Sequence, residues 1–206
     1  MRPERISLFP LNVVLLPGAI LPLHIFEPRY RRMVRECLES KCEFGMLLAI
    51  PTGVAGTGCT AEIVEIPRHY DDGRMDIIVV GRVPFRVVEL FTEDPLLEGA
   101  VDFLEDHRAA VDSRTQRQLV DLYEVCHTLT FGDYPRDARG DAGTELSYLI
   151  ADKLPMDLLW KQRILELRTE AERQERLVAY LREWAPHLQK VAAGAQAAGG
   201  NGGVLN

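Results

Sequence analysis

The first hundred residues contain short runs of apolar residues separated by Gly, Pro, Asp and Thr, a pattern typical of β-strands. We expect strands at residues 11–16, 20–26, 44–50, 61–66, 75–80, 85–90 and 97–104. Pro17-Gly18 predicts a type II turn after the first strand, and Asp72-Gly73 predicts a β-hairpin. Residues 51–58 are rich in Gly and Thr and predict a loop. Many short strands with tight connections favour an antiparallel pseudo-barrel.

One helix is expected between these strands. Pro28 suits the first position of a helix, and the apolar residues that follow it recur at helical spacing. They are Tyr30, Met33, Val34, Cys37 and Leu38. We therefore expect a helix inserted into the sheet.

From residue 112 onward the apolar spacing changes to that of amphipathic helices. The first two stripes are Leu119, Leu122, Tyr123, Cys126 and Leu129, and then Leu146, Leu149, Ile150 and Leu154. Thr144 and Asp157 are placed to cap two of the helices, and Thr169 with Glu172 forms a capping box for the last one. Pro186 should kink or end that helix.

These patterns predict an α+β chain in three parts. They are a β pseudo-barrel at residues 1–106, a helical bundle at 107–190 and a flexible Gly/Ala-rich tail at 191–206. With 206 residues, 47% of them apolar, the chain can bury enough surface to fold without disulfides or metals.

The apolar stretch PLNVVLLPGAILPLHIFEPRY is broken by prolines and polar residues, so it fits neither a transmembrane helix nor a secretory signal. Four cysteines show no CxxC pair and no disulfide-rich density. We interpret them as small buried side chains of a reduced protein. A cytoplasmic protein without a membrane partner is the expectation.

The charge and the motifs exclude several functions. The formal charge of −7 argues against a general nucleic-acid binder, which needs clustered Lys and Arg. The sequence has no GxxxxGK[ST], GxSxG or HExxH motif. Ser147, Asp152 and Lys153 share a predicted helix, where we interpret them as exposed polar residues. The sequence thus predicts no catalytic residue, no metal site and no cofactor.

Four segments along the chain carry a family resemblance. They are FPLNVVLLPGAILPLHIFEPRY, GTGCTAEIVEI, DGRMDIIVVGRVPFRVVEL, and LPMDLLWKQRILEL followed by AERQERL. In this order they resemble the N-terminal substrate-recognition domain of the Lon ATP-dependent proteases. The resemblance implies a PUA-like pseudo-barrel of about six strands followed by a helical bundle. Because the chain shows no ATPase or Ser-Lys peptidase motif, it looks like the stand-alone Lon-domain proteins of bacteria.

The same resemblance implies a function. It suggests a non-catalytic module, or an adaptor, that binds exposed apolar segments of protein or peptide partners, with a separate protease or chaperone as a further partner. An extended peptide would bind such a module at a sheet edge or in a groove. The expected contact residues are Leu16, Pro17, Ile20, Leu21 and Phe26, each of which also fits the barrel core.

A second hypothesis is a small-ligand or RNA-binding module, because PUA-like barrels resemble folds that hold nucleotides. Arg68, Tyr70, Arg74 and Arg82, around the predicted hairpin, would supply stacking and phosphate contacts. Acidic residues outnumber basic ones in the first half of the chain, which argues against RNA. A third hypothesis is a hydrolase whose catalytic residues no motif marks.

Overall fold

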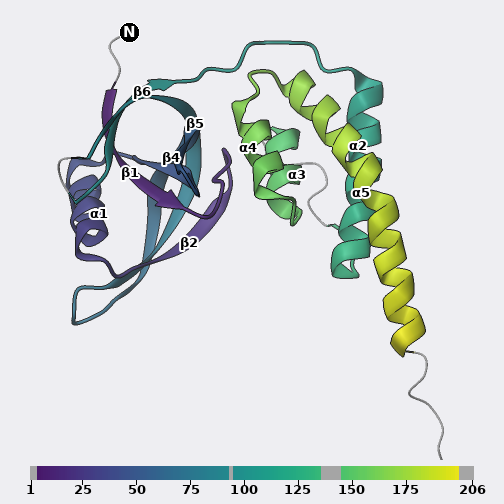
Figure 1. The fold of residues 1–206 in the computed structure, drawn as a ribbon, viewed down its shortest axis with the longest axis horizontal. Helices are drawn as coiled ribbons and strands as arrows, with labels where there is room; N and C mark the ends of the chain where they lie inside the picture. The colour runs from purple at the N-terminus through teal and green to yellow at the C-terminus, as the bar shows by residue number, and fades with distance from the viewer. Residues whose placement is uncertain (1–3, 93–94, 136–144, 200–206) are drawn as a thin grey trace, which may run out of the picture. The chain divides into compact units, whose positions relative to one another are not determined.

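The computed structural model describes residues 4–92, 95–135 and 145–199 (Figure 1). Contacts group them into two compact units. The first, here called the sheet unit, consists of the residues up to 107 together with 155–168, and the second, the helical unit, of residues 108–154 and those from 169 onward.

Six strands form one mixed sheet in the sheet unit. They are β1 (Glu4–Leu11), β2 (Ile20–Ile25), β3 (Phe44–Ile50), β4 (Gly53–His69), β5 (Met75–Phe91) and β6 (Glu98–Phe103). Their order is β2-β5-β4-β3-β1-β6, and β5 also pairs with β6, so the sheet curls into a pseudo-barrel rather than a regular closed barrel. The predicted α+β fold with six strands and one inserted helix is confirmed.

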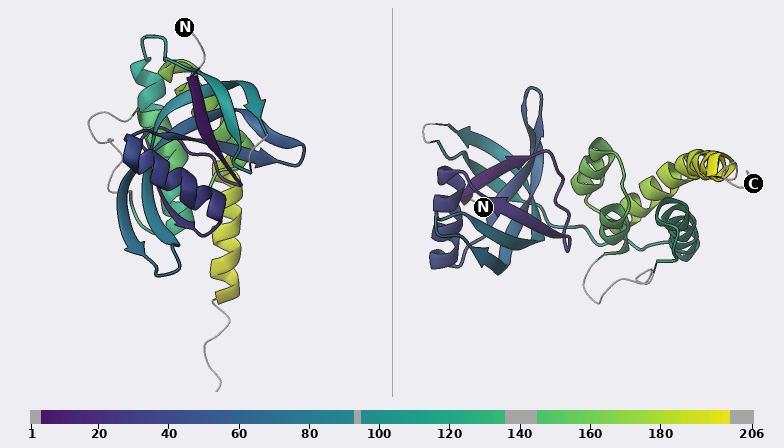
Figure 2. Two further views of the ribbon diagram at one scale, coloured as in Figure 1. Left: turned by 90° about the vertical axis from the view of Figure 1, so that its left-hand side faces the viewer. Right: turned by 90° about the horizontal axis from the view of Figure 1, so that it is seen from below.

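One strand pair departs from the antiparallel expectation, because β1 and β3 run parallel. Parallel neighbours need a long crossover connection. Here β2 and helix α1 (Pro28–Ser40) lie between the two strands in the sequence and supply it. Figures 1 and 2 show α1 on one side of the curled sheet, where its Tyr30 ring lies 4.1 Å from that of Phe9 on β1, centroid to centroid.

The strand predicted at residues 11–16 is wrong. β1 ends at Leu11, and the apolar residues after it are buried as a loop. The predicted type II turn follows this loop: the Ala19 N–H donates to the Leu16 oxygen over 3.0 Å, and Gly18 has φ of +78°. A buried loop and a buried strand share the same apolar composition, so the pattern alone did not separate them.

The loop predicted at residues 51–58 is also wrong beyond its first two residues, since β4 begins at Gly53. Its glycines allow close strand packing. A Cβ added at Gly58 would lie 2.3 Å from the Met46 carbonyl oxygen, so this position of β4 excludes a side chain. The predicted Asp72-Gly73 hairpin does join β4 to β5, with the Tyr70 N–H donating to the Arg74 oxygen over 2.9 Å.

The short helix α4 (Leu158–Glu166) belongs to the sheet unit, although the sequence predicted residues 107–190 as one helical bundle. As predicted, Asp157 caps it and accepts the Leu159 N–H over 2.8 Å. Gln162 is buried and donates to the Thr57 carbonyl oxygen of β4 over 3.0 Å. An amphipathic stripe predicts a buried helix face but not the element that covers it.

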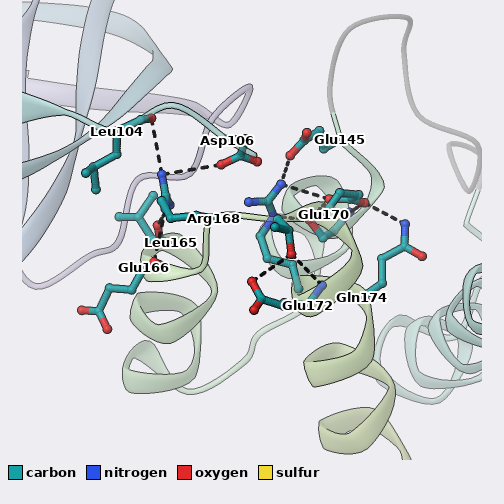
Figure 3. Close-up of polar contacts among 12 residues, drawn as sticks. Leu104, Asp106, Glu145, Leu165, Glu166, Arg168, Glu170, Glu172 and Gln174 are labelled. Atoms are coloured by element: carbon teal, nitrogen blue, oxygen red, sulfur yellow. Dashed lines mark hydrogen bonds and ion pairs between the residues drawn. The ribbon is translucent and has the colours of Figure 1, made fainter. Parts of the chain in front are cut away.

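Arg168 follows α4 and connects the end of α4 to the residues that follow β6. Its Nη1 donates to the Leu104 carbonyl oxygen over 3.4 Å and lies 3.6 Å from Asp106 (Figure 3). The Arg168 carbonyl oxygen in turn accepts the His107 N–H over 2.7 Å. The residues before position 108 and those after position 154 are therefore joined to each other within the sheet unit.

The helical unit consists of α2 (Ser113–Phe131), α3 (Leu146–Lys153) and α5 (Glu170–Gly199). Both α2 and α3 pack against α5. The predicted capping box is present: Thr169 Oγ1 accepts the Glu172 N–H over 3.2 Å and donates to its carboxylate over 2.8 Å. The predicted cap Thr144 lies outside the described residues.

α5 continues past Pro186 and is helical to Gly199, whereas the sequence predicted a flexible tail from residue 191. Alanine occupies several of these positions and has the highest intrinsic helix propensity, which explains the extension. Residues 200–206 lie outside the described part of the chain.

The core of the helical unit contains a fully buried arginine, Arg173 of α5. Its guanidinium contacts Glu145, lies 3.2 Å from Glu170, and donates from Nε to Ser147 Oγ over 2.9 Å. It also lies 4.2 Å from the centre of the Tyr148 ring. Figure 3 shows the acidic partners, and we call this set the Arg173 network. These contacts connect the start of α3 to the start of α5.

Candidate functional site

The alternation of side chains on β2 gives this strand one buried and one outward side. Leu21, Leu23 and Ile25 pair with residues of β5 that are buried in the core. Ile20, Pro22 and His24 point the other way, because successive side chains of a strand face opposite sides. β2 therefore presents an outward row that begins and ends with exposed residues.

This row continues onto β5. Ile20 pairs with Val80, Pro22 with Ile78, and His24 with Asp76, so the members of each pair share one face. We call the apolar part of this surface the outer β2 face, formed by Ile20, Pro22, Phe26, Ile78 and Val80.

Two side chains dominate the outer β2 face. Ile20 is 67% exposed and Phe26 is 59% exposed. A single exposed apolar residue is ordinary, but neighbouring ones point to an interaction surface. Here the register makes Ile20, Val80, Pro22 and Ile78 direct or adjacent neighbours, so this part of the face is continuous, and the His24–Asp76 pair separates it from Phe26.

β2 lies at one end of the strand order, so the predicted sheet edge is present. Pro22 lies in the middle of this edge strand and has no N–H to donate to an added strand. Proline on an edge strand discourages pairing with another chain. The outer β2 face therefore offers side-chain contacts more readily than main-chain hydrogen bonds.

A polar cluster borders this face at the β4–β5 hairpin. His24 Nδ1 lies 2.6 Å from Asp76 Oδ1, and the Tyr70 hydroxyl donates to Asp76 Oδ2 over 2.9 Å. The hydrogen bonds from His24 and then Tyr70 lower the pKa of Asp76, and the bond to Asp76 raises the pKa of Tyr70. The His24 ring stacks on Phe26 with centroids 6.0 Å apart, so the cluster touches the apolar face.

The predicted arginines fall into two groups. The guanidinium carbons of Arg68 and Arg74 lie 4.6 Å and 5.1 Å from the Tyr70 ring centre. Arg74 also donates from Nε to Asp72 over 2.7 Å. We call this set, with His24 and Asp76, the hairpin cluster. Arg82 lies elsewhere on β5 and pairs with Glu62 at 2.5 Å, so the structure does not bring it to Tyr70.

The predicted peptide-contact residues are also divided. Leu16 is fully buried and belongs to the core, and Pro17 and Leu21 are half-buried. Ile20 and Phe26 are exposed on the outer β2 face. Sequence reasoning missed His24 and Asp76, which are 52 residues apart and meet only because β2 pairs with β5.

The structure gives no support to the serine site that the sequence brought up. Ser147, expected to be exposed, is fully buried and binds Glu170 and Arg173. Among the described residues, no three or more His, Cys, Asp or Glu side chains gather as a metal site would require. None of the described helices is long and apolar enough to span a membrane.

Comparisons with known proteins identify relatives of this chain. The chain is 27% identical to the Lon protease of Parabacteroides distasonis over 198 residues, which cover 86% of this chain and 24% of that protein. It is 29% identical to Lon protease 2 of Myxococcus xanthus over 132 residues, 60% of this chain and 16% of the relative. This chain thus spans about a quarter or less of the length of these relatives.

Solved structures agree with the sequence relatives. The Lon N-terminal domain protein from Xanthomonas campestris, 26% identical, superposes with a TM-score of 0.69 over 86% of this chain and 98% of that one. The N-terminal domain of Mycobacterium avium complex Lon protease, 13% identical, shares the fold with a TM-score of 0.62 over 87% and 98%. The family model of the ATP-dependent protease La (LON) substrate-binding domain matches residues 5–183. The resemblance found in the sequence is confirmed, and this chain belongs to the LON substrate-binding domain family.

Proposed function

We propose that this protein binds apolar segments of other polypeptides on the outer β2 face. The observation that carries the proposal is the exposure of Ile20 and Phe26 beside the half-buried apolar residues of β5. Membership of a substrate-binding family supports a protein ligand in general. A role as an adaptor for a separate protease or chaperone would be an extension of the same binding.

The site favours a particular kind of contact. Since Pro22 hinders strand addition, the bound segment lies on the face and packs apolar side chains against Ile20 and Phe26. Burying a large apolar side chain contributes about 1.5–3 kcal/mol, or roughly tenfold to a hundredfold in affinity. Binding should therefore survive moderate salt, which weakens charge pairs but not apolar contacts.

The test is fluorescence anisotropy with a labelled, permanently unfolded polypeptide. Ile20→Ser and Phe26→Ala should each weaken binding about tenfold, because each removes apolar contact area from the face. Val88→Ser and Phe103→Ala are the matched controls, since these side chains are 54% and 40% exposed on β5 and β6 of the same sheet unit and are not part of the outer β2 face. Equal affinities for test and control variants, with the fold intact by circular dichroism, would remove this site.

The small-ligand or RNA hypothesis stays a prediction and is not proposed. Two guanidinium groups already contact the Tyr70 ring, and Arg74 is paired with Asp72. A nucleobase or phosphate would have to displace these contacts. The hairpin cluster is better explained as a polar border that fixes His24 and Phe26 beside the apolar face.

A further inference from the structure

The end of helix α1 brings two cysteines together. Lys41 adopts the left-handed conformation with φ of +52°, and its N–H donates to the Cys37 carbonyl oxygen. The Cys42 N–H donates to the same oxygen over 3.0 Å. This hydrogen bond is typical of a Schellman helix end, where a contact between the side chains of these two positions is frequent. Cys37 and Cys42 are therefore neighbours by backbone geometry.

The two thiols also interact. Burial raises the pKa of the Cys37 thiol to about 12, and the charge of Cys42 and a side-chain hydrogen bond with it add to the rise. A disulfide needs Cα atoms about 4.4–6.8 Å apart. A 3.0 Å hydrogen bond between the two backbones holds the Cα atoms near this range. A bond between the sulfurs thus needs little backbone movement.

A small molecule can reach this pair. Both cysteines line a cavity of about 290 Å³, together with Leu38, Lys41 and Glu62. Cys42 is exposed and Cys37 is buried. The exposed Cys42 also departs from the sequence interpretation of all four cysteines as buried side chains. An incoming reagent meets Cys42 first and leaves Cys37 as the inner partner.

We propose that Cys37 and Cys42 form a reversible disulfide by exchange with a low-molecular-weight disulfide. The Cys42 thiolate attacks one sulfur of the reagent, forms a mixed disulfide and expels one thiolate, which takes up the proton that Cys42 lost. The Cys37 thiolate then attacks Cys42 Sγ and expels the second thiolate, which takes up the proton from Cys37. Two protein thiols are oxidised to one disulfide, and one reagent disulfide is reduced to two thiols.

The other two cysteines provide internal controls. Cys59 is fully buried, and burial raises its pKa. Cys126 is also fully buried, and burial raises its pKa to about 11. Cys37 is also buried with a raised pKa, but its attack on the neighbouring Cys42 sulfur is intramolecular, which offsets the small thiolate fraction. Cys59 and Cys126 would have to attack a reagent from outside, and their burial excludes it. The exchange should therefore leave Cys59 and Cys126 reduced.

The experiment treats the full chain with glutathione disulfide and follows its intact mass. The expected product has lost two hydrogens, with two thiols still open to alkylation after unfolding. Trypsin cleaves after Arg35, Lys41 and Arg68, so Cys37 and Cys42 fall on separate peptides that only the disulfide joins. Fragmentation then distinguishes a bond to Cys42 from one to Cys59, which shares its peptide.

Variants separate the two steps. Cys37→Ser should stop at the mixed disulfide and keep one glutathionyl group, whereas Cys42→Ser should lose thiols at least about tenfold more slowly than the unchanged protein. Cys126→Ser should behave as the unchanged protein. An unchanged protein that stops at the mixed disulfide, or a bond that maps to Cys59 or Cys126, would overturn the proposal, as would no reaction at all.

Discussion

The hairpin cluster and the Arg173 network are built from the same chemistry in opposite surroundings. In each, a cationic or ionisable side chain contacts a carboxylate and an aromatic ring. Arg173 is fully buried in the helical unit, whereas His24 and Arg68 are exposed on the sheet unit. The Arg173 network is enclosed by the protein's own groups, whereas the hairpin cluster borders the exposed outer β2 face.

This difference predicts how strongly each set contributes to stability. A buried charge that loses its partner is expensive, so every member of the Arg173 network is needed by the others. Exposed pairs contribute little to folding, because water and salt replace their partners. Mutations should therefore affect folding most in the Arg173 network and least in the hairpin cluster.

The largest effect is expected for Arg173→Leu. Removing the guanidinium leaves the half-buried Glu170 and the buried Ser147 without it, and we expect the free energy of unfolding of the helical unit to fall by about 3–5 kcal/mol. The chain has two tryptophans, Trp160 on α4 and Trp184 on α5, so Trp160→Phe leaves Trp184 as the reporter of the helical unit. The measurement is urea unfolding followed by Trp184 fluorescence in this background. Arg176→Leu, an exposed position on α5, is the control and should change stability by less than about 0.5 kcal/mol.

Gly81→Ala should come next and act on the frame of the outer β2 face. A Cβ at Gly81 would lie 2.1 Å from the Leu16 carbonyl oxygen, so the turn before β2 must move. We expect a loss of up to about 3 kcal/mol, measured by urea unfolding with Trp160 as the reporter. Gly56→Ala, where an added Cβ meets nothing within 4 Å, should leave stability nearly unchanged. Equal effects of the two substitutions would show that the close approach at Gly81 is unimportant.

Ser147→Ala tests a neutral member of the Arg173 network. The hydroxyl bonds both Glu170 and Arg173, and its removal should lower stability by about 1–2 kcal/mol. Ser113→Ala, an exposed serine at the start of α2, is the matched control and should change stability by less than about 0.5 kcal/mol. A variant as stable as the unchanged protein would mean that the network tolerates the loss of a member.

Asp76→Asn should have the smallest effect, and this effect should depend on pH. Bonds from His24 and Tyr70 hold the pKa of Asp76 below 3.8, so the ionised carboxylate stabilises the folded state above that pH. The stabilisation is lost as the pH falls through the lowered pKa. Melting temperatures of the unchanged protein and the variant should therefore converge as the pH is lowered below 3.8.

A control keeps the Asp76 result specific. Asp71→Asn makes the same chemical change in the same hairpin and is the matched control for the loss of one acidic side chain. A pH-independent effect of Asp76→Asn would mean that the bonds to His24 and Tyr70 do not favour the ionised form.

Local signals in the sequence predicted the local structure well. Asp72-Gly73 predicted the hairpin, Pro17-Gly18 the turn, and Asp157 and Thr169 the helix starts, because each acts on its immediate neighbours. The parallel pairing of β1 with β3 could not be predicted in this way. It depends on contacts between residues far apart in the chain, which local patterns do not specify.

The candidate site was predictable only in part for the same reason. The apolar pattern marked both Leu16 and Ile20, but Leu16 is buried in the loop before β2, whereas the register of β2 on β5 leaves Ile20 exposed. Arg173 was missed because an arginine on an amphipathic helix normally marks the solvent side. Its burial depends on Glu145 and Glu170, whose meeting requires α3 to pack on α5.

Helix α4 belongs to the sheet unit but is synthesised after residues 108–154 of the helical unit, which has a consequence for folding on the ribosome. Thr57 and Leu104 receive their partners Gln162 and Arg168 only after the intervening helical segment has been made. At about 5–20 residues per second, this delay is on the order of several seconds. The nascent strands pass through this interval with the α4-facing side of β4 uncovered, a period in which chaperones have their greatest access to the chain.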